Sequence, residues 1–267
     1  MRHILSYFAV SLAALGFGSV AAHAEDAVSA HEEEAIVSST SGNDWSFTAA
    51  PYLWATGLEG DIGLFGFQPQ DVDLSFGDVL DNLEFGFMGV FEGRNGPYTL
   101  GVEMFYADIG TTINTPVGIA ATSIDADVTT FFATAYGGYA VVDDGSATVD
   151  VFGGLRFWSV DNDFSFNGGV LGGTTASDGG DWVDPVIGIK FRKDYDNNFF
   201  VSGWGMVGGF GVSSDMMWDA MGIVGYEFTD VTSVILGYRA AGVDYSSGGF
   251  VFDTVMKGPI IGAAFRF

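Results

Sequence analysis

The sequence contains no cysteine, and this absence removes several kinds of chemistry at once. Disulfide bonds, zinc sites built on thiolates and cysteine nucleophiles are all excluded. Basic residues are scarce too, because nine Lys and Arg stand against 34 Asp and Glu and give a formal net charge of −25. A chain this acidic is poorly suited to neutralising phosphates, which argues against binding to nucleic acid.

The chain also lacks a long apolar run beyond its N-terminus, so no later segment predicts a membrane-spanning helix. Residues 1–24 carry a basic residue, Arg2, near their start, continue with an apolar stretch and end in the small–x–small pattern Ala22-His23-Ala24. This order is typical of a secretory signal peptide cleaved between Ala24 and Glu25, with an uncleaved anchor as the alternative. Residues 25–44 hold six acidic residues and no Lys or Arg, and predict a flexible acidic leader.

Glycine and aromatic residues are abundant, with 40 Gly, 25 Phe, 10 Tyr and 6 Trp. They fall in ten segments in which apolar side chains alternate with small or polar ones, a pattern typical of strands that cross a membrane as a β-barrel. We therefore predict one all-β domain over residues 45–267, a transmembrane antiparallel up-and-down barrel of about ten strands, with eight or twelve as alternatives. The segments are 45–56, 84–93, 98–109, 127–142, 147–160, 182–193, 198–212, 215–228, 232–245 and 255–267.

Each segment has one apolar face and one face that is small or charged. In residues 182–193, for example, Ile187 and Ile189 oppose Lys190 and Arg192. Charged residues make up only 16% of the chain, against about 25% in soluble domains. This shortage indicates that the apolar face contacts lipid and that the charged face lines the lumen. The predicted lumen-lining residues are Glu92, Arg94, Glu103, Asp150, Arg156, Asp184, Lys190, Arg192, Asp219, Glu227 and Arg239.

Charged groups inside a narrow barrel must be paired or hydrated. Pairing would give a salt-bridge network that closes the barrel, whereas hydration would give a thin pore lined by charge. Ten strands leave little room inside, and four bulky residues share the predicted lumen face: Trp158, Trp204, Met206 and Phe210. The sequence therefore favours a closed or barely conducting barrel, and a narrow small-solute pore remains open.

The connections between segments alternate in length. Short turns are predicted at 94–97, 143–146, 194–197 and 229–231, and long connections at 57–83, 110–126, 161–181 and 246–254. Short periplasmic turns and long extracellular loops give this alternation, and an even strand number places both ends of the barrel on the periplasmic side. Within the first long connection, residues 76–83 predict a short amphipathic helix capped by Ser75, either as a plug in the lumen or packed on the rim.

The same connection carries acidic residues without a base, namely Glu59, Asp61, Asp71, Asp73, Asp78 and Asp81. Oxygen ligands suit Ca²⁺ or Mg²⁺, but their spacing does not form a known calcium loop, so we predict no specific metal site and no cofactor. A looser possibility is that divalent cations bridge these acids to lipopolysaccharide phosphates.

The C-terminal residues 258–267 alternate apolar and small residues and end in Phe265, Arg266 and Phe267. This ending resembles the last strand of Gram-negative outer-membrane proteins, which implies Phe265 and Phe267 as a signal for the barrel assembly machinery. Segments 51–63, 73–110, 181–191, 206–218 and 236–245 resemble a functionally unassigned family of small porin-like, OmpA-type outer-membrane barrels. That resemblance implies the fold and the outer membrane, with outer-membrane lipid and lipopolysaccharide as partners, but no reaction. The family pattern has arginine and aspartate before the glycine pair, where this chain has Trp204 and Met206.

Histidine, the usual acid–base catalyst near neutral pH, is absent from the predicted barrel, because His3, His23 and His31 all precede it. We therefore predict no catalytic residue and no enzymatic activity, although carboxylate pairs such as Asp161 and Asp163 leave an outer-membrane enzyme open. The favoured function is a structural barrel or a narrow pore. A binding or adhesion module, acting through the long connections, is the second hypothesis.

Overall fold

The computed structural model describes residues 45–115 and 118–267, so the predicted signal peptide and acidic leader lie outside the described residues. Ten antiparallel strands close a barrel because the last strand pairs back with the first. In spatial order they are β1 (Ser46–Trp54), β4 (Leu83–Asn95), β5 (Tyr98–Asn114), β6 (Ser123–Asp143), β7 (Ala147–Asn167), β8 (Thr175–Asp194), β9 (Phe199–Gly208), β10 (Met216–Thr229), β11 (Thr232–Ser247) and β12 (Phe250–Arg266). The predicted all-β barrel is confirmed.

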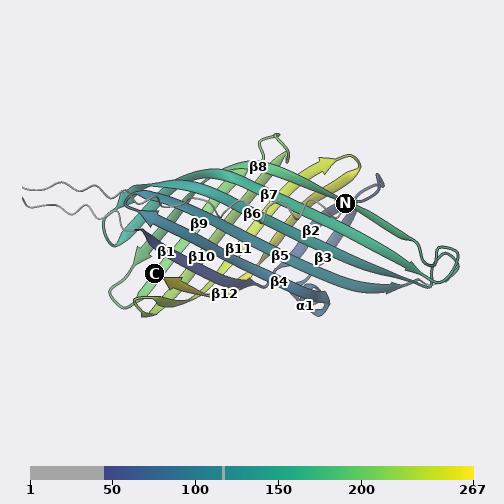
Figure 1. Cartoon of the computed structure of the whole chain (residues 1–267), viewed down its shortest axis with the longest axis horizontal. Coiled ribbons are helices and arrows are strands. Elements are labelled where there is room, and N and C mark those ends of the chain that lie inside the picture. The colour runs from purple at the N-terminus through teal and green to yellow at the C-terminus, as the bar shows by residue number, and fades with distance from the viewer. Residues whose placement is uncertain (1–44, 116–117) are drawn as a thin grey trace, which may run out of the picture. The chain divides into compact units, whose positions relative to one another are not determined.

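Two further strands, β2 (Gly57–Gly63) and β3 (Gln70–Leu74), form a hairpin outside this ring. β12 pairs with β1 along one half of its length and with β2 along the other half. Both ends of the barrel domain meet at the short-turn end, where Phe47 and Phe267 exchange two backbone hydrogen bonds of 2.7 and 2.9 Å (Figure 1).

The outer wall of the barrel is largely apolar, and the central charged side chains of its strands point inward, whereas Lys257 on β12 faces outward. Ile187 on β8 is 57% exposed, whereas Arg156 on β7 and Arg239 on β11 are fully buried. Aromatic pairs such as Tyr98 with Tyr139 and Phe199 with Tyr226 pack edge to face near the short turns. An apolar band bordered by aromatic rings is the surface that suits acyl chains.

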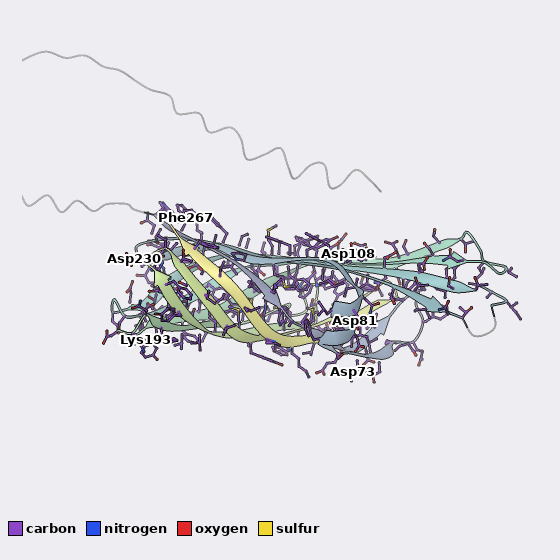
Figure 2. The ribbon with its side chains drawn as sticks, turned by 90° about the horizontal axis from the view of Figure 1, so that it is seen from below. Asp73, Asp81, Asp108, Lys193, Asp230 and Phe267 are labelled. Carbon is purple, nitrogen blue, oxygen red and sulfur yellow. The ribbon has the colours of Figure 1, made fainter. Side chains whose placement is uncertain are left out.

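Aspartates end the apolar outer face on the side away from the short turns. Asp244, Asp253, Asp61 and Asp71 are direct register partners across β11, β12, β2 and β3. On the opposite part of the wall, Asp108 follows the apolar stretch of β5, far from Lys193 and Phe267 at the other end (Figure 2). This row of four aspartates and Asp108 mark where the apolar band stops.

Most of the predicted long connections are strand rather than loop, which corrects the expectation for 110–126, 161–181 and 246–254. β6 and β7 run for 21 residues each, about twice the 9 to 11 that a barrel strand needs to cross a bilayer. These four strands, β5 to β8, extend beyond the rest of the wall as an arm (Figure 1). Their outer parts carry Ser, Thr and Asp on the outward face, and this polar composition led to the loop prediction.

The predicted helix is present as α1 (Phe76–Asn82), with Ser75 as its N-cap. Asp78 completes a capping box by accepting a hydrogen bond from the Ser75 backbone, which satisfies two of the free N–H groups at the helix start. None of its residues is buried, and Phe76 and Leu80 are exposed, so α1 lies beside β2, β3 and β5 rather than plugging the lumen. Within the described ranges, no helix is long and apolar enough to span a membrane.

Candidate functional site in the barrel lumen

Four charged side chains form a closed ring at the centre of the lumen, which we call the charge quartet: Glu103, Arg156, Asp219 and Arg239. Each arginine pairs with both carboxylates, so cations and anions alternate around the ring. Arg156 Nη2 lies 3.0 Å from Glu103 Oε2 and 2.9 Å from Asp219 Oδ2. All four side chains are at most 1% exposed, so their charges are neutralised by one another rather than by water.

Neutral side chains add hydrogen bonds to the quartet, although Arg156 Nη1 is buried without a partner among the described residues. The Tyr52 hydroxyl donates to Glu103 Oε1 at 3.0 Å and accepts from Arg239 Nη1 at 2.6 Å. The Thr134 hydroxyl accepts from Arg156 Nε at 2.7 Å, and the Trp204 indole donates to Asp219 Oδ1 at 3.0 Å. Such partners are what a buried ion pair needs in order to offset the loss of hydration.

A column of aromatic rings fills the lumen between the quartet and the arm. Its central rings contact one another in sequence, with centroids 3.9 to 5.6 Å apart: Phe105 stacks on Phe132, Phe132 is tilted against Trp158, Trp158 stacks on Trp182 and Trp182 on Tyr245. The quartet contacts this column through cation–π interactions, with Arg156 4.7 Å from the Phe132 ring. The aromatic column and the quartet therefore form one continuous block across the lumen.

On the other side of the quartet, toward the short turns, lies a cavity of about 200 Å³. Tyr52 and Trp204 form its inner end, and Ser46, Asp230 and Arg266 line it near the barrel mouth. Ion pairs cross it: Lys190 with Glu92 from strands four places apart in the ring, and Arg94 with Asp150. Arg192 lies 2.6 Å from Glu227 and its guanidinium stacks 3.7 Å above the Phe200 ring.

The structure thus divides the eleven predicted lumen residues into three groups. Four form the quartet, and six lie at the mouth cavity, namely Glu92, Arg94, Asp150, Lys190, Arg192 and Glu227. Asp184 belongs to neither group: its carboxylate, fully buried, accepts hydrogen bonds from Ser214 Oγ at 2.6 Å, the Ser214 backbone at 2.9 Å and the Trp182 indole at 3.1 Å. It fastens the loop after β9 onto β8.

Sequence reasoning missed part of this interior and misplaced one residue. Tyr52 and most of the aromatic column were not singled out, although Tyr52 shares the inward parity of Thr48 and Trp54 and could have been found that way. Trp158, Trp204 and Met206 are buried inside. Phe210 is not: it follows the end of β9, in a turn with a positive φ of 54°, and is exposed.

The remaining predicted residues are those of the two terminal signals and the acidic residues of the first long connection. Phe265 and Phe267 are exposed beside the chain end, and Ala24 and Glu25 lie outside the described residues. Of the acidic residues of the first connection, Glu59 pairs with Lys257 at 2.6 Å and Asp78 caps α1. In the part of the chain that the structure describes, no three His, Asp or Glu side chains are arranged to hold a metal ion.

No family model matches the chain, and no curated protein matches it by sequence. Among solved structures, the outer membrane protease OmpT from Escherichia coli is similar with a TM-score of 0.53 at 11% identity, over 85% of this chain and 98% of that one. Ail, the attachment invasion locus protein of Yersinia pestis, gives a TM-score of 0.34 at 13% identity over 84% and 98%. Neisserial surface protein A gives 0.32 at 12% identity over 83% and 97%.

The likeness to OmpT defines the class of this chain by fold: it is a β-barrel of the outer-membrane type. At 11% identity, that likeness carries no information about catalysis.

Proposed function

We propose that the protein is a closed, non-conducting barrel of the Gram-negative outer membrane, which anchors the arm of β5 to β8 at the cell surface. The observation that carries this proposal is the block formed by the quartet and the aromatic column. Arg156, Arg239 and Asp219 are fully buried at the centre of the lumen, and Phe132 and Trp158 are fully buried directly beside them. A hydrated ion would have to break these ion pairs to pass.

Conductance measurements test the closed barrel. Purified, refolded protein inserted in planar bilayers is expected to give no steady conductance steps, because the quartet pairs its charges without water. Insertion must be shown separately, by protease protection of the barrel in vesicles of the same lipid. Stable, ion-selective steps from inserted protein would contradict the proposal and favour the narrow-pore alternative.

The outer-membrane location is supported by the apolar outer wall, the inward charges and the barrel fold. Its test is the gel mobility of protein extracted from the outer-membrane fraction, because folded barrels of this kind resist detergent until boiled. An unshifted band, or recovery of the protein as a dissolved periplasmic species, would contradict the location.

A surface-binding role is the second candidate, and the arm favours it. The arm ends in two connections, one between β5 and β6 and one between β7 and β8. Backbone hydrogen bonds join these two tips, from Val170 N–H to the Ile119 carbonyl at 3.0 Å and from Leu171 N–H to the Ala120 carbonyl at 2.8 Å. The tips expose the apolar side chains of Ile119 and Val170. A variant with residues 111–126 replaced by a two-residue turn should still fold, since Gly110 and Asp127 are register partners. Loss of cell adhesion with intact folding would support this role.

The proposal includes no catalysis. It is supported by the position of all three histidines before residue 32, and by the pairing of the central charges with one another. Lipopolysaccharide is the proposed partner of the outer wall, and divalent cations are proposed to bridge its phosphates to the acidic rim near Asp61 and Asp73. Equal melting of the barrel with and without chelator, in lipopolysaccharide-containing vesicles, would contradict that bridging.

A further inference from the structure

The cavity at the short-turn end has the make-up of a small-molecule site rather than of a simple water-filled mouth. Its apolar lining includes Phe200, Ile235 and Ile260, and charged groups lie among them. Small-molecule sites typically combine an apolar lining with a few placed polar groups, and about 200 Å³ is room for a compact solute.

The charged lining is balanced. Arg94, Lys190, Arg192 and Arg266 supply four positive charges, and Glu92, Asp150, Glu227 and Asp230 supply four negative charges. A solute with a single net charge would meet a like charge wherever it met its counter-ion. A zwitterion presents both signs and can lie along such pairs without adding net charge to a largely buried space.

Two atoms of the Arg94–Asp150 pair indicate how a bound solute would be oriented. The pair uses Arg94 Nη2 and Asp150 Oδ2, and among the described residues Arg94 Nη1 and Asp150 Oδ1 are buried without a hydrogen-bond partner. The Asp150 side chain is only 3% exposed, so its spare acceptor is costly to leave unused. The Arg94 side chain is 25% exposed, and a small shift of it into the cavity would open both atoms: an ammonium group would then donate to this carboxylate, and a carboxylate would accept from the arginine.

We propose that the mouth cavity is a binding site for a small zwitterion of the amino-acid class, with its ammonium at Asp150, its carboxylate at Arg94 and Lys190, and its carbon skeleton against Phe200 and Ile235. The site is a dead end. Tyr52 and Trp204 close its inner side, and both are hydrogen-bonded to the quartet. The solute therefore enters and leaves at the short-turn end, and binding is independent of any passage through the barrel.

Equilibrium dialysis of the full mature chain in detergent tests the site with three radiolabelled probes: L-alanine, propionate, which lacks its ammonium group, and ethylammonium, which lacks its carboxylate. Alanine should bind, and each single-charge probe should bind at least about tenfold more weakly, because it leaves one end of the ion pair without a partner. Propionate or ethylammonium binding as tightly as alanine would overturn the zwitterion assignment, and absence of alanine binding would overturn the site.

Matched variants place the binding in the cavity. Lys190→Gln and Asp150→Asn should each weaken alanine binding about tenfold, whereas Lys257→Gln on the outer wall should leave it unchanged. Ala50→Phe fills the cavity without removing a polar partner and should abolish binding, provided that its heat-dependent gel shift shows a folded barrel. Equal losses in Lys190→Gln and Lys257→Gln, or full binding by folded Ala50→Phe, would overturn the proposal. None of these outcomes alters the conductance test of the closed barrel.

Discussion

Glu103 and Asp219 face each other across the barrel, from strands five places apart in a ring of ten, and the same two guanidinium groups join them. The two walls of the lumen are therefore tied together through side chains as well as through the sheet. A carboxylate at either position would be strongly disfavoured alone in this interior, but each has two cationic partners. Removing any one of the four side chains therefore leaves a buried charge with fewer partners.

Arg239→Met should destabilise the folded barrel by about 3–5 kcal/mol, because it leaves Glu103 and Asp219 sharing one buried cation. Urea unfolding in detergent micelles, followed by the heat-dependent gel shift, measures the change. Lys257→Met is the control: Lys257 is half exposed in its pair with Glu59, so its loss should cost at most about 1 kcal/mol. Equal stability of Arg239→Met and the parent chain would contradict the quartet.

The aromatic column predicts a second large effect inside the lumen. Trp158 is fully buried between Phe132 and Trp182, and Trp158→Ala should cost about 3–5 kcal/mol through lost contacts and an unfilled cavity. Trp45→Ala removes the same side chain from the exposed outer wall and should cost clearly less. In planar bilayers the Trp158→Ala barrel should stay closed, since the quartet still blocks the lumen; steady conductance would show that the column alone seals it.

Gly101 makes room for a ring inside the barrel, and this predicts a sharp contrast between two glycines. A Cβ on Gly101 would lie 2.3 Å from the ring of Tyr136, whose hydroxyl donates to Glu92 at 2.8 Å. Gly101→Ala should therefore displace Tyr136 and destabilise the barrel by about 1–3 kcal/mol. A Cβ on Gly222 would meet no atom within 4 Å, so Gly222→Ala should change the stability of the barrel by less than about 0.5 kcal/mol. Similar unfolding midpoints for the two variants would contradict the packing.

The fold was predictable from sequence because period two is a local signal. The alternation around Ile187 and Arg156 assigns each side chain to one face of the sheet, whichever strand pairs with it. The barrel and its charged lumen could therefore be predicted. Which charges pair is not local. Glu103 and Arg239 are 136 positions apart, and their contact depends on strand count and register, neither of which the alternation specifies.

The errors have similar physical causes. Strand ends beyond the apolar band carry polar residues on their outward face, so the outer third of β7 (Ala147–Asn167), residues 161–167, was predicted as a connection. Phe210 follows the inward parity of β9, but the strand ends two residues earlier, at Gly208, and parity has no meaning in the turn that follows. The inward parity of Tyr52 could have placed it in the lumen, but parity gives no sign that its hydroxyl bonds to two charged partners, Glu103 and Arg239.

Like charges in register predict a stabilising substitution on the outer wall. Asp253 is paired directly with Asp244 on one side and with Asp61 on the other. Opposed like charges destabilise a sheet by about 0.2–1 kcal/mol, so Asp253→Asn should raise the urea midpoint of the barrel. The gain should shrink in high salt, because these exposed charges are screened. Lower stability at low salt would show that the carboxylate has a favourable partner.

The turn between β6 and β7 predicts a pH dependence. Asp144 Oδ1 accepts hydrogen bonds from the backbone N–H groups of Ser146 at 2.9 Å and Ala147 at 2.7 Å, and these bonds hold the pKa of Asp144 below its usual value. A carboxyl whose pKa is lower in the folded chain than in the unfolded chain stabilises the fold at pH values above its unfolded pKa, which is about 3.9 for Asp. That stabilisation is lost as the pH falls through the folded pKa.

Asp144→Ala should therefore unfold at lower urea than the parent chain at pH 7, and the gap between the two midpoints should narrow as the pH falls below about 4. Unfolding curves of both proteins in the same detergent, from pH 7 to pH 2.5, give the measurement. Asp230→Ala, in the turn between β10 and β11, controls for the loss of one exposed charge near the barrel mouth. If the difference between the two urea midpoints stayed constant over this range, protonation of Asp144 would not weaken its hydrogen bonds. The stability of the turn would then not depend on the ionised carboxylate.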